Sequence, residues 1–435
     1  MPPRRSTRVA AAVEQRAWAF PQLPLPFVLD VFALLPADQR LRAAEVSRGW
    51  RATVAMPALW TRLDLSPASG VVQRNLAALL RAAVARAGDA LIVINLSGTS
   101  IRTDVVHAAL RSASRVEEVD LRDTRSIGVV ALAALLAAAP QLRVCHADVY
   151  CDLAGAVALF EARALFAPLR IHALDLRGAD GTLPPDLALA LADARLQPDL
   201  AHVDLHFADL RAPAAFDAVA DAVVARQRLC QLRLFDCRLS PAVAPALARA
   251  LRGGALTELD IFKCNGQFVD ESSAAVLCDA LRADSTLTSL RLHDCNAPPL
   301  AAPAVAAILG GLVAHRSLRV LNLSFTRLEM DAAACAALGA LIAADAPALA
   351  QLYMQLCGLG EAGLGALLDA LPSNNHLRVL SIRNNDVPAG FMAAHLLPAV
   401  RGNTSLRDLR ADADAREDED DKRARQEAQR IIAAR

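Results

Sequence analysis

One spacing of apolar residues recurs along most of the chain and limits what the chain can fold into. In its clearest copy, from Leu229 to Leu239, apolar residues occupy positions 1, 4, 6, 9 and 11. Further copies begin at Leu256, Leu287, Leu318, Leu349 and Leu377. From the sixth position of the first copy (Leu65) to that of the last (Ala411) there are 411 − 65 = 346 residues in twelve steps, or roughly 29 residues per step. A spacing that persists for twelve periods predicts a repeat array.

This spacing resembles that of leucine-rich repeats, in which the apolar positions form a strand and a corner. Ala- and Leu-rich stretches such as residues 244–251 and 364–371 lie between the strands and favour helices. A strand and a full helix in each repeat resemble the ribonuclease-inhibitor type. The resemblance implies an α/β solenoid over residues 63–411 with about 12–13 repeats. Its parallel sheet would line the concave face, and its helices would form the convex face.

The cysteines follow the same register. Four of the nine occupy the ninth repeat position, where leucine-rich repeats take Asn or Cys. These four are Cys237, Cys264, Cys295 and Cys357. A small polar side chain there interacts with the backbone where the chain turns inside the stack. We therefore predict that these thiols are free and buried. This use of cysteine favours a reducing compartment, cytoplasmic or nuclear.

Residues 21–62 carry a different pattern, with short helical stretches between prolines. Its anchors are Leu23-Pro24, Val31-Phe32, Leu35-Pro36, Val46-Ser47-Arg48-Gly49-Trp50-Arg51 and Leu59-Trp60. At this spacing they resemble the F-box family, a small all-α domain, over about forty residues. Pro26 departs from the family, which usually has an acidic residue there, but proline is tolerated at a helix start.

The F-box resemblance implies docking on the Skp-type adaptor of a cullin ubiquitin ligase. The adaptor-binding residues that it implies are Leu23, Pro24, Phe27, Val31, Phe32, Leu35, Val46 and Trp50. The alternative is that residues 21–62 only cap the open end of the solenoid, since every repeat array needs a cap. A domain this small can hardly fill its own core, which favours a partner for its excess apolar surface.

The repeat register also predicts which side chains line the concave face. Positions 3, 5, 7 and 8 point away from the core, whereas positions 4 and 6 point into it. We expect target binding by His206, Phe207, Arg233, Phe235, Phe262, Arg291, His293, Phe325 and Tyr353. Exposed aromatic residues flanked by charge are typical of binding hot spots. Two alternatives stay open: the phenylalanines pack over the sheet edge, and the alternating charges at position 5 only attract one another across the sheet.

The two ends of the chain are expected to lie outside the repeat array. Residues 1–20 are Arg-rich and are predicted to form a disordered leader. Residues 412–421 are mostly acidic, and residues 422–435 are basic and helix-prone. We therefore expect residues 412–435 to form a charged, solvated helix or a frayed end after the last repeat.

Composition and missing motifs exclude several functions. Lys plus Arg and Asp plus Glu both number 46, and this neutrality argues against nucleic acid and anionic membranes as partners. The longest uncharged apolar run, residues 127–140, is too short to span a bilayer. The chain has no phosphate loop, no dinucleotide fingerprint, no His-Glu-x-x-His and no nucleophile elbow, so no enzyme activity, cofactor or metal is expected.

The sequence thus predicts a substrate-recognition subunit of a Skp–cullin–F-box-type ubiquitin ligase. The F-box would dock on the adaptor, and the repeats would bind a target protein. The alternative is a ligase-independent leucine-rich-repeat scaffold or inhibitor. A receptor or decoy directed at a host's adaptor would have the same sequence features.

Overall fold

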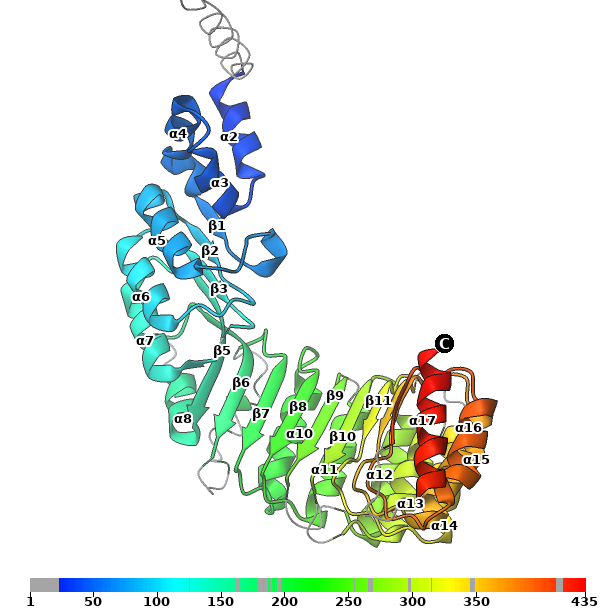
Figure 1. The fold of residues 1–435 in the computed structure, drawn as a ribbon. Coiled ribbons are helices and arrows are strands. Elements are labelled where there is room, and N and C mark those ends of the chain that lie inside the picture. Colours follow the sequence, from blue (N-terminus) through cyan, green and yellow to red (C-terminus); the bar gives the residue numbers. More distant parts are fainter. Residues whose placement is uncertain are drawn as a thin grey trace, which may run out of the picture. The chain divides into compact units, whose positions relative to one another are not determined.

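The computed structural model combines an amino-terminal group of helices with a parallel sheet flanked by helices (Figure 1). It describes residues 23–124, 126–161, 165–178, 183, 187, 190–191, 193, 197–253, 255–264, 269–295, 299–313, 315–344, 349–411 and 418–435. The predicted leader, residues 1–20, and residues 412–417 of the predicted tail lie outside these ranges. The chain divides into two compact units, with residues 1–148 and 164–170 in the first and the rest in the second.

The first unit begins with a helical domain, which we define as residues 23–61. It contains the helices α2 (Leu25–Ala33), α3 (Ala37–Ala43), α4 (Arg48–Val54) and the 3-10 helix η2 (Pro57–Trp60). Pro26 lies in the first turn of α2, where a missing N–H costs nothing. The side chain of Ser47 caps α4 by accepting a hydrogen bond from the backbone N–H of Trp50 at 3.1 Å.

The repeats of the first unit follow directly. Their strands are β1 (Arg62–Asp64), β2 (Val93–Asn95), β3 (Glu118–Leu121) and β4 (Ile127–Gly128), and their helices are α5 (Leu76–Ala87), α6 (Thr103–Ser112) and α7 (Val129–Ala138). Short 3-10 turns, η3 (Pro67–Ser69) and η4 (Gly88–Ala90), flank α5. Leu63 pairs with Ile94, and Ile94 with Val119, so the fourth repeat positions lie side by side as the register predicts.

The remaining strands continue the sheet in the order of the sequence. They are β5 (Val144–Asp152), β6 (Leu169–Arg177), β7 (His202–His206), β8 (Gln231–Phe235), β9 (Glu258–Phe262), β10 (Ser289–His293), β11 (Val320–Asn322), β12 (Gln351–Tyr353), β13 (Val379–Ser381) and β14 (Asp408–Arg410). In the described residues the sheet has 14 strands, with β4 paired only to β5. From β6 to β14 every described pair is parallel and joins equivalent repeat positions.

Helices cover one face of the sheet in the second unit. They are α8 (Leu153–Glu161), α10 (Pro213–Ala225), α11 (Ala244–Arg252), α12 (Glu271–Ala283), α13 (Ala302–Leu312), α14 (Ala332–Ala343), α15 (Gly360–Ala370), the π-helical turn η7 (Met392–Leu396), α16 (Leu397–Gly402) and α17 (Glu419–Ala433). Two 3-10 turns, η5 (Pro241–Val243) and η6 (Leu371–Ser373), join this layer. Positions 4 and 6, such as Leu232 and Leu234, are buried beneath the helices, which leaves the opposite, open face to positions 5 and 7.

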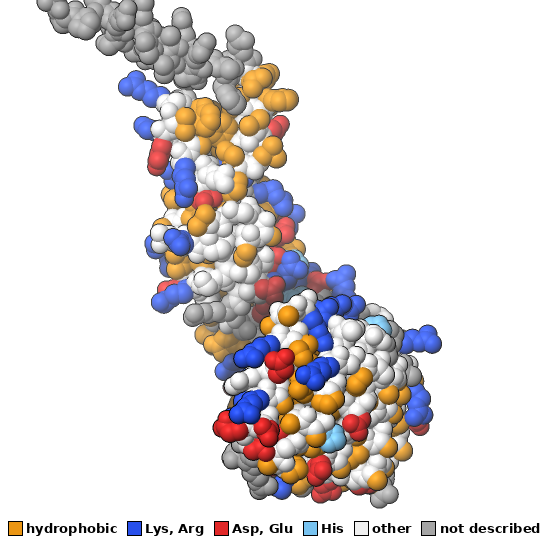
Figure 2. Space-filling model, turned by 45° about the vertical axis from the view of Figure 1, so that its right-hand side comes forward, with side chains coloured by type: hydrophobic (Ala, Val, Ile, Leu, Met, Phe, Trp, Pro, Cys, Tyr) orange, Lys and Arg blue, Asp and Glu red, His pale blue; other side chains and the backbone are white. Residues whose placement is uncertain are grey.

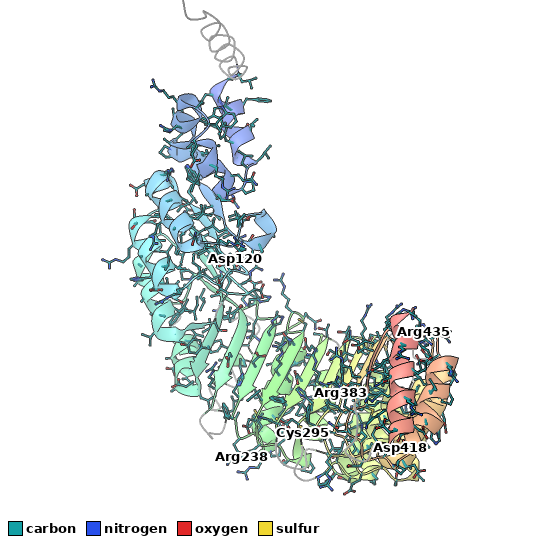
Figure 3. All side chains as sticks on the ribbon, viewed as in Figure 1. Asp120, Arg238, Cys295, Arg383, Asp418 and Arg435 are labelled. Atoms are coloured by element: carbon teal, nitrogen blue, oxygen red, sulfur yellow. The ribbon has the colours of Figure 1, made fainter. Side chains whose placement is uncertain are left out.

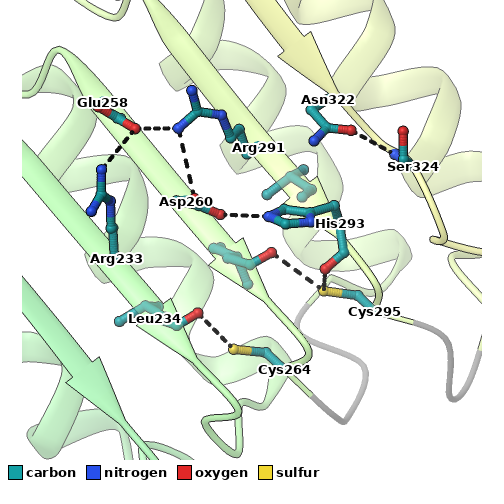
Figure 4. Close-up of polar contacts among 12 residues, drawn as sticks. Arg233, Leu234, Glu258, Asp260, Cys264, Arg291, His293, Cys295, Asn322 and Ser324 are labelled. Atoms are coloured by element: carbon teal, nitrogen blue, oxygen red, sulfur yellow. Dashed lines mark hydrogen bonds and ion pairs between the residues drawn. The ribbon is translucent and has the colours of Figure 1, made fainter. Parts of the chain in front are cut away.

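The ninth-position side chains bind the backbone inside the stack, as predicted. The Cys237 thiol donates to the Leu205 carbonyl at 3.3 Å, and the Cys357 thiol donates to the Leu323 carbonyl at 3.1 Å. Figure 4 shows the same contact from Cys264 to the Leu234 carbonyl, at 3.5 Å. Each thiol thereby links its corner to a strand of the preceding repeat. All nine cysteines are free.

We expect the buried thiols to resist alkylation. Burial raises the pKa of Cys145 and of Cys295 to about 12, so almost none of the reactive thiolate exists at neutral pH. Cys230 and Cys278 are only half-buried. Iodoacetamide followed by peptide mass spectrometry should label these two first and should label Cys145 and Cys295 only after unfolding in urea. Rapid native labelling of Cys295 would contradict the described stack.

A second polar column, which the sequence analysis missed, lies three residues before the first repeat position. Its described members are buried and hold the loop that leads from helix to strand; they are Arg226, Asp284, His315, Asn374 and Asn403. The Asn403 amide accepts from the backbone N–H of Leu406 at 2.9 Å and donates to the Leu371 carbonyl, also at 2.9 Å. Each such side chain satisfies backbone groups that would otherwise be buried without partners.

The carboxy-terminal helix α17 is neither fully solvated nor frayed, in contrast to the two expectations for the tail. One side of it is buried, through Asp421, Ala424, Ala428 and Ile432. The Asp421 carboxylate accepts from the backbone N–H of Gly390 at 2.7 Å and of Ala393 at 2.9 Å. The Arg435 guanidinium donates to the Val400 carbonyl at 2.6 Å, and Figure 3 labels Arg435 and Asp418 at the two ends of α17. The helix therefore closes the last repeat.

Candidate binding surfaces

The helical domain exposes several large apolar side chains, which we call the apolar face. They are Leu23, Leu25, Phe27, Val31, Leu34 and Val46. Phe27, Val31 and Leu34 are spaced i, i+4, i+7 and so form one stripe along α2. Figure 2 shows hydrophobic side chains gathered over this domain. Phe27 is 61% exposed, Leu34 84% and Val46 64%. Exposed apolar side chains gathered on one small domain mark a candidate interaction site.

The predicted adaptor-binding residues divide between this face and the interior. Leu23, Pro24, Phe27, Val31 and Val46 are exposed, and Leu35 and Trp50 are half-buried. Phe32 is only 2% exposed, and its ring meets the edge of the Trp50 ring at a centroid distance of 5.2 Å. Phe32 is thus a core residue that supports α2 and does not itself contact solvent. Leu25 and Leu34, which the sequence analysis did not select, belong to the exposed set.

Arg40 and Trp60 hold the helical domain together. The Arg40 guanidinium donates to the carbonyls of Leu35 at 2.7 Å, Ala33 at 2.7 Å and Leu59 at 3.1 Å, which ties the end of α2 to η2. Burial lowers the pKa of Arg40. Trp60 is fully buried, and its indole N–H donates to the Val54 carbonyl at 2.7 Å. Together these contacts fix α2 and therefore the apolar face.

A groove of about 550 Å³ lies between α3 and the segment that precedes and begins α5. Its walls include Leu41, Val72 and Ala78, with Arg42 and Arg74 beside them. One carboxylate oxygen of Asp38 is buried there without a hydrogen-bond partner among the described residues. The groove adjoins the apolar residues of the first repeat and was not indicated by any sequence motif.

The open face of the second unit carries the predicted ladder of charges at position 5. Asp204 pairs with Arg233, Arg233 with Asp260, and Asp260 with Arg291 in the strand register. Glu258, at position 3, bridges the two arginines: it lies 3.5 Å from Arg233 and makes a closer ion pair with Arg291 (Figure 4). The charges of the ladder therefore lie within ion-pair distance of one another across the sheet, and they are also partly exposed to solvent.

The aromatic side chains at the seventh repeat position lie in contact with one another. The ring centroids of His206 and Phe235 are 5.0 Å apart, those of Phe235 and Phe262 4.8 Å, and those of Phe262 and His293 4.4 Å. The ring of Phe207 meets that of Phe235 edge-on at 6.0 Å. Phe325 and Tyr353 occupy the two following repeats and are not among the ring contacts of the described residues. The predicted target-binding rings from His206 to His293 therefore form one cluster, and Phe325 and Tyr353 lie outside it.

The eighth repeat position has left-handed backbone along this unit. The φ angles lie between 53° and 60° at Phe207, Asp236, Lys263, Asp294, Phe325, Leu356 and Asn384. Asp and Asn tolerate this conformation, whereas a bulky side chain pays about 1–2 kcal/mol for it. Phe207, Phe325 and Leu356 are nevertheless exposed there. Because Asp236, Lys263 and Asn384 share this conformation, it is a property of the repeat corner.

Phe207→Asn is expected to change the free energy of unfolding by less than about 1 kcal/mol, because relief of the strained backbone offsets the lost ring contacts. The fully buried Phe216 is the matched control, since Phe216→Ala should cost about 3–5 kcal/mol. Urea unfolding followed by circular dichroism measures both. If Phe207→Asn lowered the free energy of unfolding as much as Phe216→Ala, Phe207 would have to pack against the sheet edge.

No group of three or more His, Cys, Asp or Glu side chains in the described ranges is arranged to hold a metal ion. Within the same ranges, no helix combines the length and the apolar character needed to cross a bilayer.

Comparison with known proteins gives a family model for the amino-terminal residues and a relative of part of the chain. Residues 20–66 match the family model of F-box-like domains, a span that contains every anchor from Leu23 to Trp60. A stretch of 180 residues is 29% identical to NACHT, LRR and PYD domains-containing protein 5 of Bos taurus. That alignment covers 41% of this chain and only 16% of the relative, whose name includes LRR domains. The chain thus combines an F-box-like domain with an α/β repeat solenoid.

Proposed function

We propose that this protein is a substrate-recognition subunit of a Skp–cullin–F-box-type ubiquitin ligase. The observation that carries the proposal is the apolar face on a domain that matches the F-box-like model. Phe27 is largely exposed on a helical stripe. Removing such apolar surface from water is favourable by about 25 cal/mol per Å². Docking on a Skp-type adaptor, and through it on a cullin, would bury it.

The second part of the proposal is that the repeats, of the ribonuclease-inhibitor type, hold a target protein on the open face. Its support is the cluster of half-buried rings and exposed charges that runs from His206 to His293. In this role the chain performs no bond chemistry and needs no cofactor. It raises the effective concentration of the target near the enzyme that transfers ubiquitin, in an intracellular, reducing compartment.

The alternative is a ligase-independent scaffold or inhibitor in which the helical domain only caps the repeats. One observation favours it: η2 packs on α5, and Trp60 occupies the first position of the first repeat as well as the core of the helical domain. The domain therefore covers the end of the first repeat whether or not an adaptor binds.

Reconstitution separates the two functions. The purified full chain is mixed with a Skp-type adaptor and a cullin and resolved by size-exclusion chromatography. One peak that holds all three proteins is expected for the ligase subunit. Elution of the chain apart from every Skp-type adaptor tried would favour the scaffold. A Phe32→Asp variant is unsuitable as the negative control, because Phe32 is a core residue and its replacement would unfold the domain.

A further inference from the structure

A small pocket opens at the centre of the ring cluster on the open face. It has a volume of about 230 Å³ and is lined by Asp204, His206, Arg233, Leu234, Phe235, Asp260, Phe262 and His293. Pockets that bind small molecules usually measure about 300–1,000 Å³. The size of this pocket therefore suits a single long side chain better than a cofactor or metabolite.

Most charged groups around the pocket already lie close to a polar or charged partner. Glu258 pairs with both Arg233 and Arg291, and Asp260 lies 3.1 Å from the ring Nε2 of His293. Asp175, on the neighbouring strand, lies 3.4 Å from the ring Nε2 of His206. The two arginines of the ladder are thus engaged by a carboxylate, which reduces their attraction for an incoming anion.

Asp204 and Asp260 are the two carboxylates that line the pocket, and Asp204 is the one without a hydrogen-bond donor close by among the described residues. Its Oδ2 lies 3.9 Å from the nearest guanidinium nitrogen of Arg233, and its Oδ1 has no hydrogen-bond partner among the described residues. Burial raises the pKa of Asp204; Arg233 opposes this, and the carboxylate of Asp175 adds to it. The Oδ1 atom is buried, so a donor from outside would reach this carboxylate through the 28% of the side chain that is exposed.

The pocket walls suit a cation as well. Phe235 and Phe262 stand side by side at a centroid distance of 4.8 Å, and both are half-buried. The ammonium of Lys263 already lies 5.5 Å from the Phe262 ring centroid, so this ring attracts a positive charge within the chain itself. Aromatic faces beside a carboxylate are the surroundings in which an arginine side chain binds well, since guanidinium both stacks and donates.

We propose that this pocket binds a basic side chain, Arg or Lys, of the target protein, with Asp204 as its ion-pairing partner and Phe235 and Phe262 as its walls. This inference rests on the proposed function of the open face as a target-binding surface. An acidic anchor is disfavoured because it would meet the carboxylates of Asp204 and Asp260 in the same pocket.

A peptide selection tests the inference. A phage library of random decapeptides is selected against the immobilised full chain, in parallel with the variants Asp204→Asn and Asp209→Asn. Asp204→Asn keeps the shape of the side chain and removes its charge. Asp209→Asn is the matched control, because the Asp209 carboxylate pairs with Arg211 at 2.6 Å and does not line the pocket.

The expected result is a strong enrichment of Arg or Lys at one peptide position with the wild type and with Asp209→Asn. A synthetic peptide from that set should bind Asp204→Asn about tenfold more weakly or worse, as expected for loss of a partly buried charge pair. Enrichment of acidic or uncharged peptides, no enrichment at all, or a basic preference that survives Asp204→Asn would each overturn the proposal.

Adaptor binding is measured on the same variants, so that the two proposals fail separately. Absence of a basic preference in the wild type, or its survival in Asp204→Asn, with the adaptor still bound would refute the pocket assignment alone. A basic preference without binding to any Skp-type adaptor would refute the ligase function and leave the pocket in place.

Discussion

The substitution Trp60→Ala is expected to destabilise the F-box-like domain by about 3–5 kcal/mol, because it removes a large buried ring from a small core. The Trp60 ring is fully buried, and its N–H satisfies the Val54 carbonyl at 2.7 Å. The Arg40 guanidinium lies 5.7 Å from the ring centroid and would lose that contact as well. A domain of this size has little stability to spare, so we expect α2 and α4 to unfold.

Native-state hydrogen exchange measures this loss directly. Amides of α2–α4 should lose protection, while those of α12–α14 in the second unit should keep it, because repeat proteins unfold locally. Trp60→Phe is the milder control: it keeps most of the ring volume and loses the N–H bond, at a cost of about 1 kcal/mol for that bond. Unchanged protection of the α2 amides in Trp60→Ala would show that the Trp60 ring is not needed to stabilise the core of the domain.

Asp421→Ala is expected to cost about 1.5–3 kcal/mol and to release α17 from the last repeat. The Asp421 side chain is buried, and its two oxygens accept from the backbone N–H groups of Gly390 and Ala393 at the start of the preceding helical segment. Alanine would leave these two donors buried without partners. The terminal cap of a repeat array protects the apolar side of the final repeat, so its release should also promote association.

Limited proteolysis and light scattering follow the release of α17. The variant should be cleaved after residue 411 much faster than the wild type and should form larger particles. Asp420→Ala is the matched control, since the Asp420 side chain is 77% exposed and pairs only loosely with Arg423 at 3.5 Å. Equal rates of cleavage in Asp421→Ala, Asp420→Ala and the wild type would show that α17 does not depend on the Asp421 contacts.

The register of the sheet could be predicted from the sequence because two independent patterns agreed on it. Apolar positions 4 and 6 fixed which side chains point inwards, and the ninth position fixed where each strand turns. Leu232 pairs with Leu259, and Leu259 with Leu290, as their shared repeat position requires. Even Cys145, in a copy that begins at Leu142 and has only Ala147 at its sixth position, pairs with Val119.

The orientation of α2 could not be predicted with the same certainty. Both sides of this helix are apolar, so its spacing alone does not tell which side packs inwards. Phe32 was grouped with Phe27 and Val31, yet it faces the core, whereas Leu34 on the other side is 84% exposed. The side of α2 that faces the core depends on the position of α4, through the contact between Phe32 and Trp50.

Several features of the second unit depend on the fold and leave no sequence signal. The left-handed backbone of the eighth position is a property of the corner, and a phenylalanine such as Phe207 gives no hint of it. The buried column from Arg226 to Asn403 uses different residue types for one task, so no motif marks it. The spare carboxylate of Asp204 becomes apparent only once every neighbouring ion pair is located.

The affinity of the purified full chain for a Skp-type adaptor tests the central claim most directly. The wild type is compared by calorimetry with a Phe27→Asp/Val46→Asp double variant, which places two charges on the apolar face without touching the core. Val130→Asp is the matched control, since Val130 is 85% exposed on α7, away from this face.

We predict that the wild type and Val130→Asp bind alike, whereas the double variant binds about 100-fold more weakly, as expected when hot-spot side chains are lost. The double variant should keep the circular dichroism spectrum of the wild type. Absence of binding by the wild type to every Skp-type adaptor, or equal binding by the folded double variant, would contradict the account and leave residues 20–66 as a cap on the repeats.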